Sequence, residues 1–218
     1  MTITYLGHSG FTVRVGGRLL IFDALGGVEP TAEDRAVAFV SHAHADHFWP
    51  EVRRWRAAGQ CALVTGEGVG EGICLKRGET AEADGVRVRA FGSTDEGVSF
   101  LAEAGGARIF HAGDFNFWSW REESTQAEVD EAEALFEDML SEMRDMRPDV
   151  AFFPVDPRMK TAYDEGALRF AAAARPRLII PMHFWNEPGA ALAFARKPMP
   201  PGVSARAMVE KGGSIEWT

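Results

Sequence analysis

Three histidines and one aspartate fall within six consecutive positions of this 218-residue chain, at His42, His44, Asp46 and His47. An apolar run directly precedes them and predicts a strand. Residues two apart in a strand point to the same side, so His42 and His44 can present nitrogens to one point. Asp46 and His47 follow where the chain must turn, and can reach a second point close by. Neutral imidazole and carboxylate suit zinc, and imidazole also suits iron. The alternative is a solvated histidine-rich turn, which has no packing use and would repel itself when protonated. The stretch therefore predicts a metal site.

Several other apolar runs end in a polar residue of a type that acts at metal sites. These strand-end residues are Asp23, His42, Asp114, Asp156 and His183. Strand ends gathered along one edge of a sheet form a rigid scaffold that presents functional groups on loops. We therefore expect these side chains to meet at one edge. For Asp23 and Asp114, capping of an ordinary turn is the alternative.

The His-x-His-x-Asp-His pattern at a strand end resembles the metal-binding motif of the metallo-β-lactamase superfamily of metal-dependent hydrolases. Two later elements match that family in the right order. One strand delivers Gly113 and Asp114, and another delivers His183 in a Pro-x-His pattern. The resemblance implies an α+β fold of four layers, with two mixed β-sheets packed face to face, helices on the outer faces and the metals at one edge.

The resemblance also implies a division of six ligands between two metal positions. The implied ligands are His42 and His44 for the first metal, Asp46, His47 and His183 for the second, and Asp114 on the second or bridging both. Asp46 and Asp114 are then the catalytic groups, because they can orient the attacking water or accept its proton. Zinc lowers the pKa of bound water from about 15.7 to about 7. The implied activity is hydrolysis of an ester, lactone, amide or phosphodiester bond by a metal-bound hydroxide.

One element departs from the superfamily pattern. The family usually supplies a third imidazole for the first metal after the strand that ends near residue 91, but this sequence has no histidine between residues 48 and 110. Ser93 and Thr94 stand there instead, and hydroxyls are poor zinc ligands, so we place both near the substrate or behind the ligands. Asp95 is a candidate substitute ligand, with an ordinary turn residue as the alternative. We therefore expect one tightly bound zinc and a second that is weak or absent, with iron or manganese as other candidate metals.

Three more residues are expected near the site. The resemblance implies that Asp23 orients the metal-binding loop through hydrogen bonds, a common requirement of metal sites. His8 belongs to a Gly-His-Ser element that faces the site in some branches of the superfamily. It is a candidate for contacting the substrate or supporting the ligands, with a purely structural role as the alternative. That element also resembles the branch containing ascorbate-phosphate lactonases. His111, three residues before Asp114, is expected to pack behind the site.

Aromatic residues follow several candidate ligands directly. Four of the six tryptophans, Trp49, Trp118, Trp120 and Trp185, each lie within a few residues of one. They are candidates for lining an apolar substrate pocket or a contact between two copies of the chain. The alternative is that they close the core beneath the site.

Composition restricts the classes of function. A formal net charge of −9 argues against a nucleic-acid backbone as the partner and leaves a small-molecule substrate. No segment has the apolar length of a membrane span, and the N-terminus lacks signal-peptide features. The two cysteines follow no metal-type spacing, so reduced thiols in the cytoplasm are expected. The length suits one domain over residues 1–218.

Local signals predict two of the elements that support the site. Gly16 and Gly17 predict a hairpin turn after the first β segment, residues 3–15. Thr125 and Glu128 form a capping-box pattern, which predicts a helix running to about residue 147, before Pro148.

Two functions of other classes stay open at this point. One is an iron-binding redox metalloprotein, since some members of the superfamily hold iron. The other is a non-catalytic binding protein with a degraded site, because the third imidazole of the first position is missing.

Overall fold

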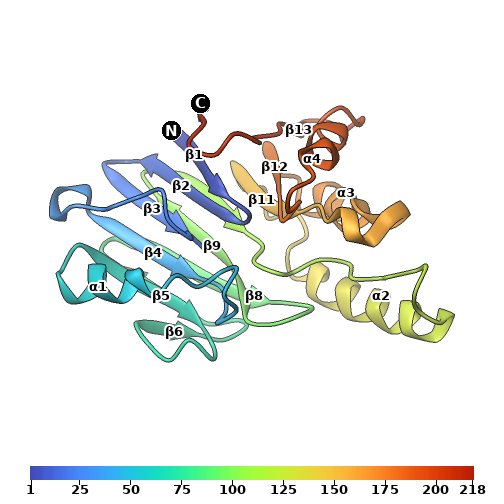
Figure 1. The fold of residues 1–218 in the computed structure, drawn as a ribbon, viewed down its shortest axis with the longest axis horizontal. Helices are drawn as coiled ribbons and strands as arrows, with labels where there is room; N and C mark the ends of the chain where they lie inside the picture. Colours follow the sequence, from blue (N-terminus) through green and yellow to red (C-terminus); the bar gives the residue numbers. More distant parts are fainter.

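The computed structural model describes residues 1–218 as two seven-stranded β-sheets packed face to face (Figure 1). The first sheet has the strand order β14-β1-β2-β3-β4-β5-β6. Its strands are β1 (Thr2–Gly7), β2 (Gly10–Val15), β3 (Arg18–Phe22), β4 (Ala36–Val40), β5 (Cys61–Gly66), β6 (Ile73–Leu75) and β14 (Ser214–Glu216). The second sheet has the order β13-β12-β11-β10-β9-β8-β7. Its strands are β7 (Thr80–Ala83), β8 (Val86–Gly92), β9 (Val98–Ala104), β10 (Ala107–His111), β11 (Val150–Pro154), β12 (Leu178–Met182) and β13 (Ser204–Ala205).

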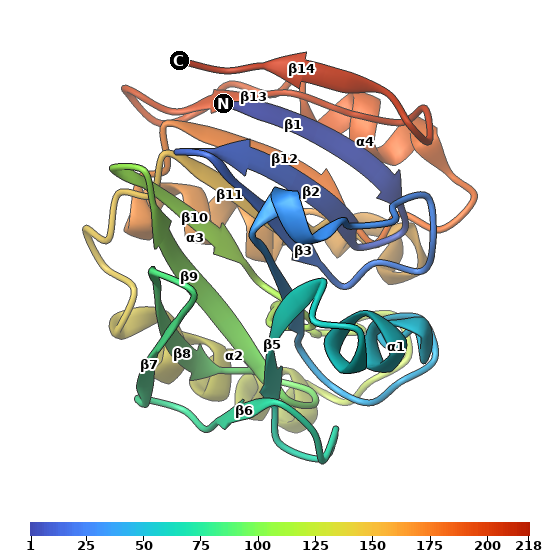
Figure 2. The same cartoon turned by 90° about the vertical axis from the view of Figure 1, so that its left-hand side faces the viewer.

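Helices cover the outer face of each sheet. They are α1 (Glu51–Ala57), α2 (Gln126–Ser141), α3 (Glu165–Ala174) and α4 (Pro188–Phe194), with short 3-10 turns η1 (Ala32–Asp34) and η2 (Pro157–Ala162). Figure 2 shows α1 in front of the first sheet, while α2, α3 and α4 lie on the far side of the second. The predicted four-layer α+β sandwich is therefore confirmed.

One side of each sheet, from the middle strand to one edge, consists of parallel strands. The strands from β3 to β6 pair in parallel, as do those from β10 to β13. The central strands β4, β11 and β12 are buried along their whole length. Their unbroken apolar sequences are what a strand covered on both faces requires. In each sheet, parallel pairing brings the carboxyl ends of several strands to one edge.

Aromatic rings hold the two sheets together. The Phe11 ring of β2 stacks on the Phe152 ring of β11 with centroids 4.1 Å apart, and Phe39 of β4 lies 5.5 Å from Phe100 of β9. These rings belong to a continuous cluster of 48 buried residues contributed by both sheets and the helices α2, α3 and α4. A smaller cluster of 12 residues fills the space between the first sheet and α1. Tight packing of this kind fixes the relative position of the two sheets.

The two ends of the chain lie close together (Figure 1). The Met1 amino group donates to the Trp217 carbonyl oxygen at 2.7 Å, and β14 pairs with β1 at the edge of the first sheet. No helix of the structure combines the length and apolar content needed to cross a membrane.

Two local predictions can be compared with the structure. The glycine pair does form the turn between β2 and β3, but residues 3–15 are divided into β1 and β2 by a tight turn at His8 and Ser9. The helix predicted to reach residue 147 begins as expected but ends at Ser141. The Asp145 and Arg147 amides instead donate to carbonyl oxygens at the end of α3, which draws the chain out of the helix.

Replacement of Thr125 by alanine should lower the free energy of unfolding by about 1 kcal/mol, because the N-cap of α2 is lost. Thr125 Oγ1 accepts from the Glu128 amide, and Glu128 Oε2 accepts from the Thr125 amide at 2.7 Å. Urea denaturation of Thr125→Ala measures the loss, and Thr125→Ser, which keeps the hydroxyl, is the control. Equal stability of the alanine and serine variants would contradict the capping role.

Candidate metal centre

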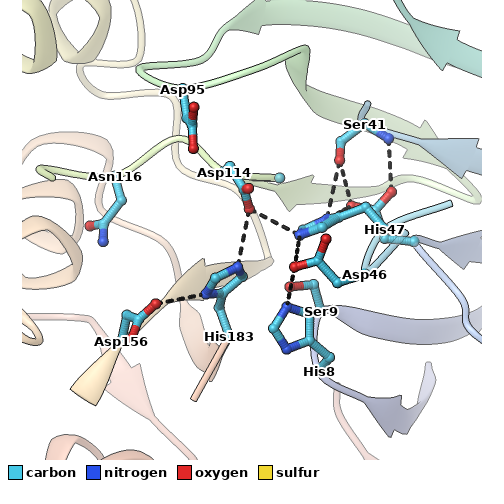
Figure 3. Close-up of polar contacts among 12 residues, drawn as sticks. His8, Ser9, Ser41, Asp46, His47, Asp95, Asp114, Asn116, Asp156 and His183 are labelled. Atoms are coloured by element: carbon cyan, nitrogen blue, oxygen red, sulfur yellow. Dashed lines mark hydrogen bonds and ion pairs between the residues drawn. The ribbon is translucent and has the colours of Figure 1, made fainter. Parts of the chain in front are cut away.

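The carboxyl ends of strands from both sheets present polar side chains to one region. Asp23 follows β3, His42 follows β4, Asp114 follows β10, and His183 follows β12 directly. Figure 3 shows Asp114 and His183, from the second sheet, facing His47 and Asp46 from the first. The predicted meeting of strand ends at one edge is therefore observed.

The first group of donors consists of His42, His44 and Asp114. One ligand atom from each lies within 4.8 Å of the others. His42 Nε2 is 3.4 Å from Asp114 Oδ2, and both side chains are buried, whereas His44 is half exposed. Two imidazoles and one carboxylate thus converge at this position.

The second group of donors consists of His8, Asp46, His47 and His183, again with ligand atoms within 4.8 Å of one another. His8 Nε2 lies 3.4 Å from Asp46 Oδ2, and the His8 and His183 rings are 4.3 Å apart. His8 is brought there because the His183 amide donates to the His8 carbonyl oxygen at 3.3 Å. This position therefore collects three imidazoles and one carboxylate.

Asp114 lies between the two groups. Its Oδ2 faces His42, while its Oδ1 lies 3.0 Å from His47 Nε2 and 3.5 Å from His183 Nε2. Burial raises the pKa of Asp114, but the neighbouring His47 outweighs it and holds this pKa well below its usual range. Asp114 can therefore serve both groups as an ionised carboxylate.

Buried atoms without a hydrogen-bond partner show that these residues fit a cation. They include Nε2 of His8, His42, His47 and His183, together with Oδ1 of Asp114, although His47 Nε2 and Asp114 Oδ1 form an ion pair at 3.0 Å. Buried polar atoms in proteins nearly always have a partner, and each one left unsatisfied costs about 1–3 kcal/mol. Five such atoms of metal-ligating type converging on one region are explained by a bound divalent metal ion.

Hydrogen bonds at the far side of the rings select the nitrogen that faces the site. His47 Nδ1 donates to Asp23 Oδ2 at 2.7 Å, and His183 Nδ1 donates to Asp156 Oδ2 at 3.0 Å. His42 Nδ1 lies 3.0 Å from the Ser41 hydroxyl, which itself donates to Asp23. With Nδ1 protonated in each ring, the Nε2 lone pairs point at the site, as ligation requires.

The charges around His8 and His47 differ strongly. Burial and the neighbouring His183 lower the pKa of His8 to about 4, so His8 is neutral near pH 7. Burial also lowers the pKa of His47, but Asp114 and Asp23 outweigh it and raise this pKa to about 10. Of these two carboxylates, Asp114 faces His47 Nε2 and would hold a cation there, while Asp23 keeps its bond to Nδ1.

Close backbone packing fixes the start of the metal-binding loop. Asp23 accepts from both the amide and the hydroxyl of Ser41, at 2.8 and 2.6 Å. Gly97 has a φ of +70°, and a Cβ there would collide with the Ser41 carbonyl oxygen. Ser41 is therefore held between the Asp23 side chain, next to the first sheet, and the Gly97 backbone, next to the second sheet.

His111 is fully buried behind the site and contributes no atom to either group of donors. Its Nε2 donates to the Ser9 carbonyl oxygen at 2.8 Å, while its Nδ1 accepts from the Gly113 amide at 3.1 Å. The ring thus ties the turn that carries His8 to the turn that carries Asp114.

The segment that lacks the third imidazole contacts the site in an unexpected way. Thr94 Oγ1 is hydrogen-bonded to both the amide and the carbonyl of Asn116, and Ser93 Oγ accepts from the Asp95 amide.

The carboxylate of Asp95 lines the cavity but belongs to neither donor group, and Glu96 Oε2 instead lies 3.3 Å from His44 Nε2. Burial, followed by repulsion from Asp114, raises the pKa of Asp95. The carboxylate nearest to His44 is thus Glu96, which sequence reasoning missed because two adjacent acids could not be ranked without the loop conformation.

The donors open into a cavity of about 360 Å³. The residues that line it are His44, Asp46, Thr94, Asp95, Asp114, Trp118, Trp120, Arg158, His183 and Trp185. Trp118 and Trp185 therefore lie where the sequence suggested.

Trp49 does not line this cavity, contrary to expectation. It packs edge-on against Trp55 of α1, with ring centroids 5.3 Å apart, because the loop after His47 turns beneath that helix. Trp120 lines the cavity as the sequence suggested, whereas sequence reasoning missed Arg158. Arg158 comes two residues after Asp156, at a strand end, which is the one signal that could have indicated it.

Comparison with known proteins gives matches over most of the chain. A family model described as "Beta-lactamase superfamily domain" matches residues 2–131. A UPF0173 metal-dependent hydrolase of Methanocorpusculum labreanum is 28% identical over 201 residues, covering 84% of this chain and 83% of the relative. A UPF0173 metal-dependent hydrolase of Thermus thermophilus is 26% identical over 237 residues, covering 94% and 95%.

Solved structures share the fold. Igni18, described as a novel metallo hydrolase from Ignicoccus hospitalis, aligns with a TM-score of 0.63 and 21% identity over 100% of this chain and 99% of its own. CmlA, a diiron β-hydroxylase from Streptomyces venezuelae, aligns with a TM-score of 0.65 and 13% identity, covering 99% of this chain and 54% of its own.

Replacement of Asp23 by asparagine should lower metal affinity about 10- to 100-fold, because the ring of His47 loses its orienting carboxylate. Competition with a chelator measures the affinity, and a thermal unfolding curve separates weaker binding from loss of the fold. Asp34→Asn is the control, since Asp34 pairs with Arg14 at the surface. Unchanged affinity in a folded Asp23→Asn variant would disprove the orienting role.

Proposed function

The chain belongs to the metallo-β-lactamase superfamily, and from this premise we propose that it is a metal-dependent hydrolase of a small molecule. The observation that carries the proposal is the set of unpartnered, buried imidazole and carboxylate atoms on both sides of Asp114. The names of the UPF0173 relatives support the same class of activity.

We propose that the second group is the strong metal position. His8, His47 and His183 supply three imidazoles there, and Asp46 supplies a carboxylate. Four nitrogen and oxygen ligands would bind zinc tightly, and expansion to five-coordination would let the ion take up a water molecule from the cavity. The first group, with His42, His44 and the shared Asp114, has no third imidazole and would bind a metal more weakly.

A divalent ion held at the strong position would lower the pKa of its bound water to about 7 and would polarise the carbonyl or phosphoryl oxygen of the substrate. The residues around it have separate tasks. Asp46 is one-third exposed and lines the cavity, so it is placed to orient a water molecule and take its proton. Asp114 is buried and turns one oxygen to each group, so its task is to hold the two positions together.

The proposed reaction is hydrolysis of an ester, lactone, amide or phosphodiester bond. With a single strong metal position, only one cation stabilises the charge that develops on oxygen. This favours an ester or lactone, because a phosphodiester is already an anion and its transition state carries more total negative charge. The cavity volume of about 360 Å³ suits a small substrate.

Protein purified without added metal should contain about one zinc per chain by elemental mass spectrometry. His183→Ala should reduce the metal content to near zero, because His183 belongs to the stronger position. Two zincs per chain would disprove the unequal positions, and wild-type metal content in His183→Ala would disprove the ligand set. Iron with visible colour would favour a redox function instead.

His8→Ala should weaken retention of the tightly bound metal about tenfold or more, because one of four ligands is removed. The matched control is His44→Ala, which removes an imidazole from the weaker position and should leave the tight metal in place. Dissociation constants from chelator competition measure both variants. If His8→Ala retains metal as the wild type does, His8 contacts only the substrate or supports the ligands.

A further inference from the structure

Arg158 is the only arginine or lysine among the ten residues that line the cavity. Three carboxylates line it as well: Asp46, Asp95 and Asp114. The chain as a whole carries a formal charge of −9. A cation in this position is therefore a local exception to the charge of the protein.

The guanidinium of Arg158 is held in place from one side. Asp156 accepts from the Arg158 amide at 2.9 Å and from Nε at 3.0 Å, and Nη2 also donates to this carboxylate. No hydrogen bond involves Nη1, and the side chain is 48% exposed. The outer edge, formed by Nη1 and the second N–H of Nη2, is thus free in a fixed orientation. This edge has the planar fork geometry that matches two oxygens of a carboxylate or phosphate.

Indole rings flank the guanidinium. Its central carbon lies 4.7 Å from the Trp185 ring centroid and 5.7 Å from that of Trp120. Trp118 stacks on Trp120 at 6.0 Å with an angle of 11° between the ring planes. The arginine thus lies within a wall of flat apolar surfaces that continues into the cavity.

The backbone of two of these tryptophans has a strained conformation. Trp120 and Trp185 have φ values of +41° and +51°, a region that costs a bulky residue about 1–3 kcal/mol. Trp185 is also 42% exposed, so it gains little from burial. Backbone strain that displays an exposed indole beside a candidate active site is typical of a ligand-binding surface.

We propose that this wall binds an organic anion, with a carboxylate or phosphate on the outer edge of Arg158 and a planar apolar body against the indoles of Trp118, Trp120 and Trp185. The substrate of the hydrolase is then an anionic molecule with a flat ring or unsaturated group, and this assignment alone rests on the proposed function. Binding itself does not depend on turnover.

The position of Arg158 relative to the metal centre supports the proposal. Asp156 Oδ2 accepts from His183 Nδ1 as well as from Arg158. The arginine and a proposed metal ligand therefore lie on two sides of one carboxylate oxygen. If the anionic group of a ring-sized substrate were bound to Arg158, the bond to be hydrolysed would lie near Asp114 and Asp46.

The test is equilibrium binding to the metal-containing protein, followed by quenching of tryptophan fluorescence. The probes are 2-naphthoate, 2-naphthyl phosphate and the neutral 2-naphthamide. At least one anion should bind about tenfold more tightly than the amide, and Arg158→Gln should remove this difference. Arg158→Lys keeps the charge but not the fork, and should recover only part of it. Trp185→Leu should weaken all three probes.

The controls separate this site from the metal. Arg121→Gln removes an exposed arginine that pairs with Glu165 and does not line the cavity, and should bind as the wild type does. Metal content is measured for every variant, since a carboxylate probe can also bind zinc directly. Anion preference that survives in Arg158→Gln at equal metal content would overturn the proposal, as would equal affinity of the wild type for anions and amide. Hydrolysis of naphthyl esters is measured separately, so failed turnover with intact binding would count only against the hydrolase function.

Discussion

The buried carboxylate of Asp23 is the interaction on which the site depends. It is almost fully buried, and a charge in that position is tolerated only when its oxygens are satisfied. The Ser41 amide, the Ser41 hydroxyl and His47 Nδ1 satisfy them. Burial raises the pKa of Asp23, but the neighbouring His111 and His47 outweigh it and lower this pKa. One ionised group thus fixes the strand end and the ring orientation together.

Both sheets contribute donors to the site whose loop Asp23 fixes. Strands of the first sheet carry the histidine-rich loop, and strands of the second carry Asp114 and His183. The stacked rings of Phe11 and Phe152 hold these sheets in one position, which is why donors from both can converge within a few ångströms. Asp156 has the same role in the second sheet as Asp23 in the first: it accepts a hydrogen bond from Nδ1 of a histidine, here His183, and so orients the ring.

The two donor groups differ in their number of imidazoles and in their position in the cavity. The group with three imidazoles lies on the side of His183, and Asp156 connects that ring to Arg158. The other group lies toward the half-exposed His44, whose Nε2 is 3.3 Å from Glu96 Oε2. The proposed reaction and the proposed anion-binding wall are therefore on the same side of the cavity, joined by one buried carboxylate.

Features that depend on neighbours along the chain can be read from the amino-acid sequence. The spacing of His42, His44, Asp46 and His47 specifies a metal-binding loop wherever a strand precedes it, and the apolar runs specify the strands. The sandwich itself was implied by the resemblance of that motif to a known superfamily. The hairpin glycines and the N-cap of α2 were local in the same sense. These signals are readable because their physical cause lies within a few residues.

Which distant residues contact that loop depends on the tertiary structure. His8 reaches the donors through a bond to the backbone of His183, Glu96 rather than Asp95 approaches His44, and Trp49 turns under α1 instead of facing the cavity. The end of α2 likewise depends on carbonyl groups of α3. Apart from Trp49, which packs against the nearby Trp55, these are contacts between residues far apart in the chain, and no spacing in the sequence encodes them.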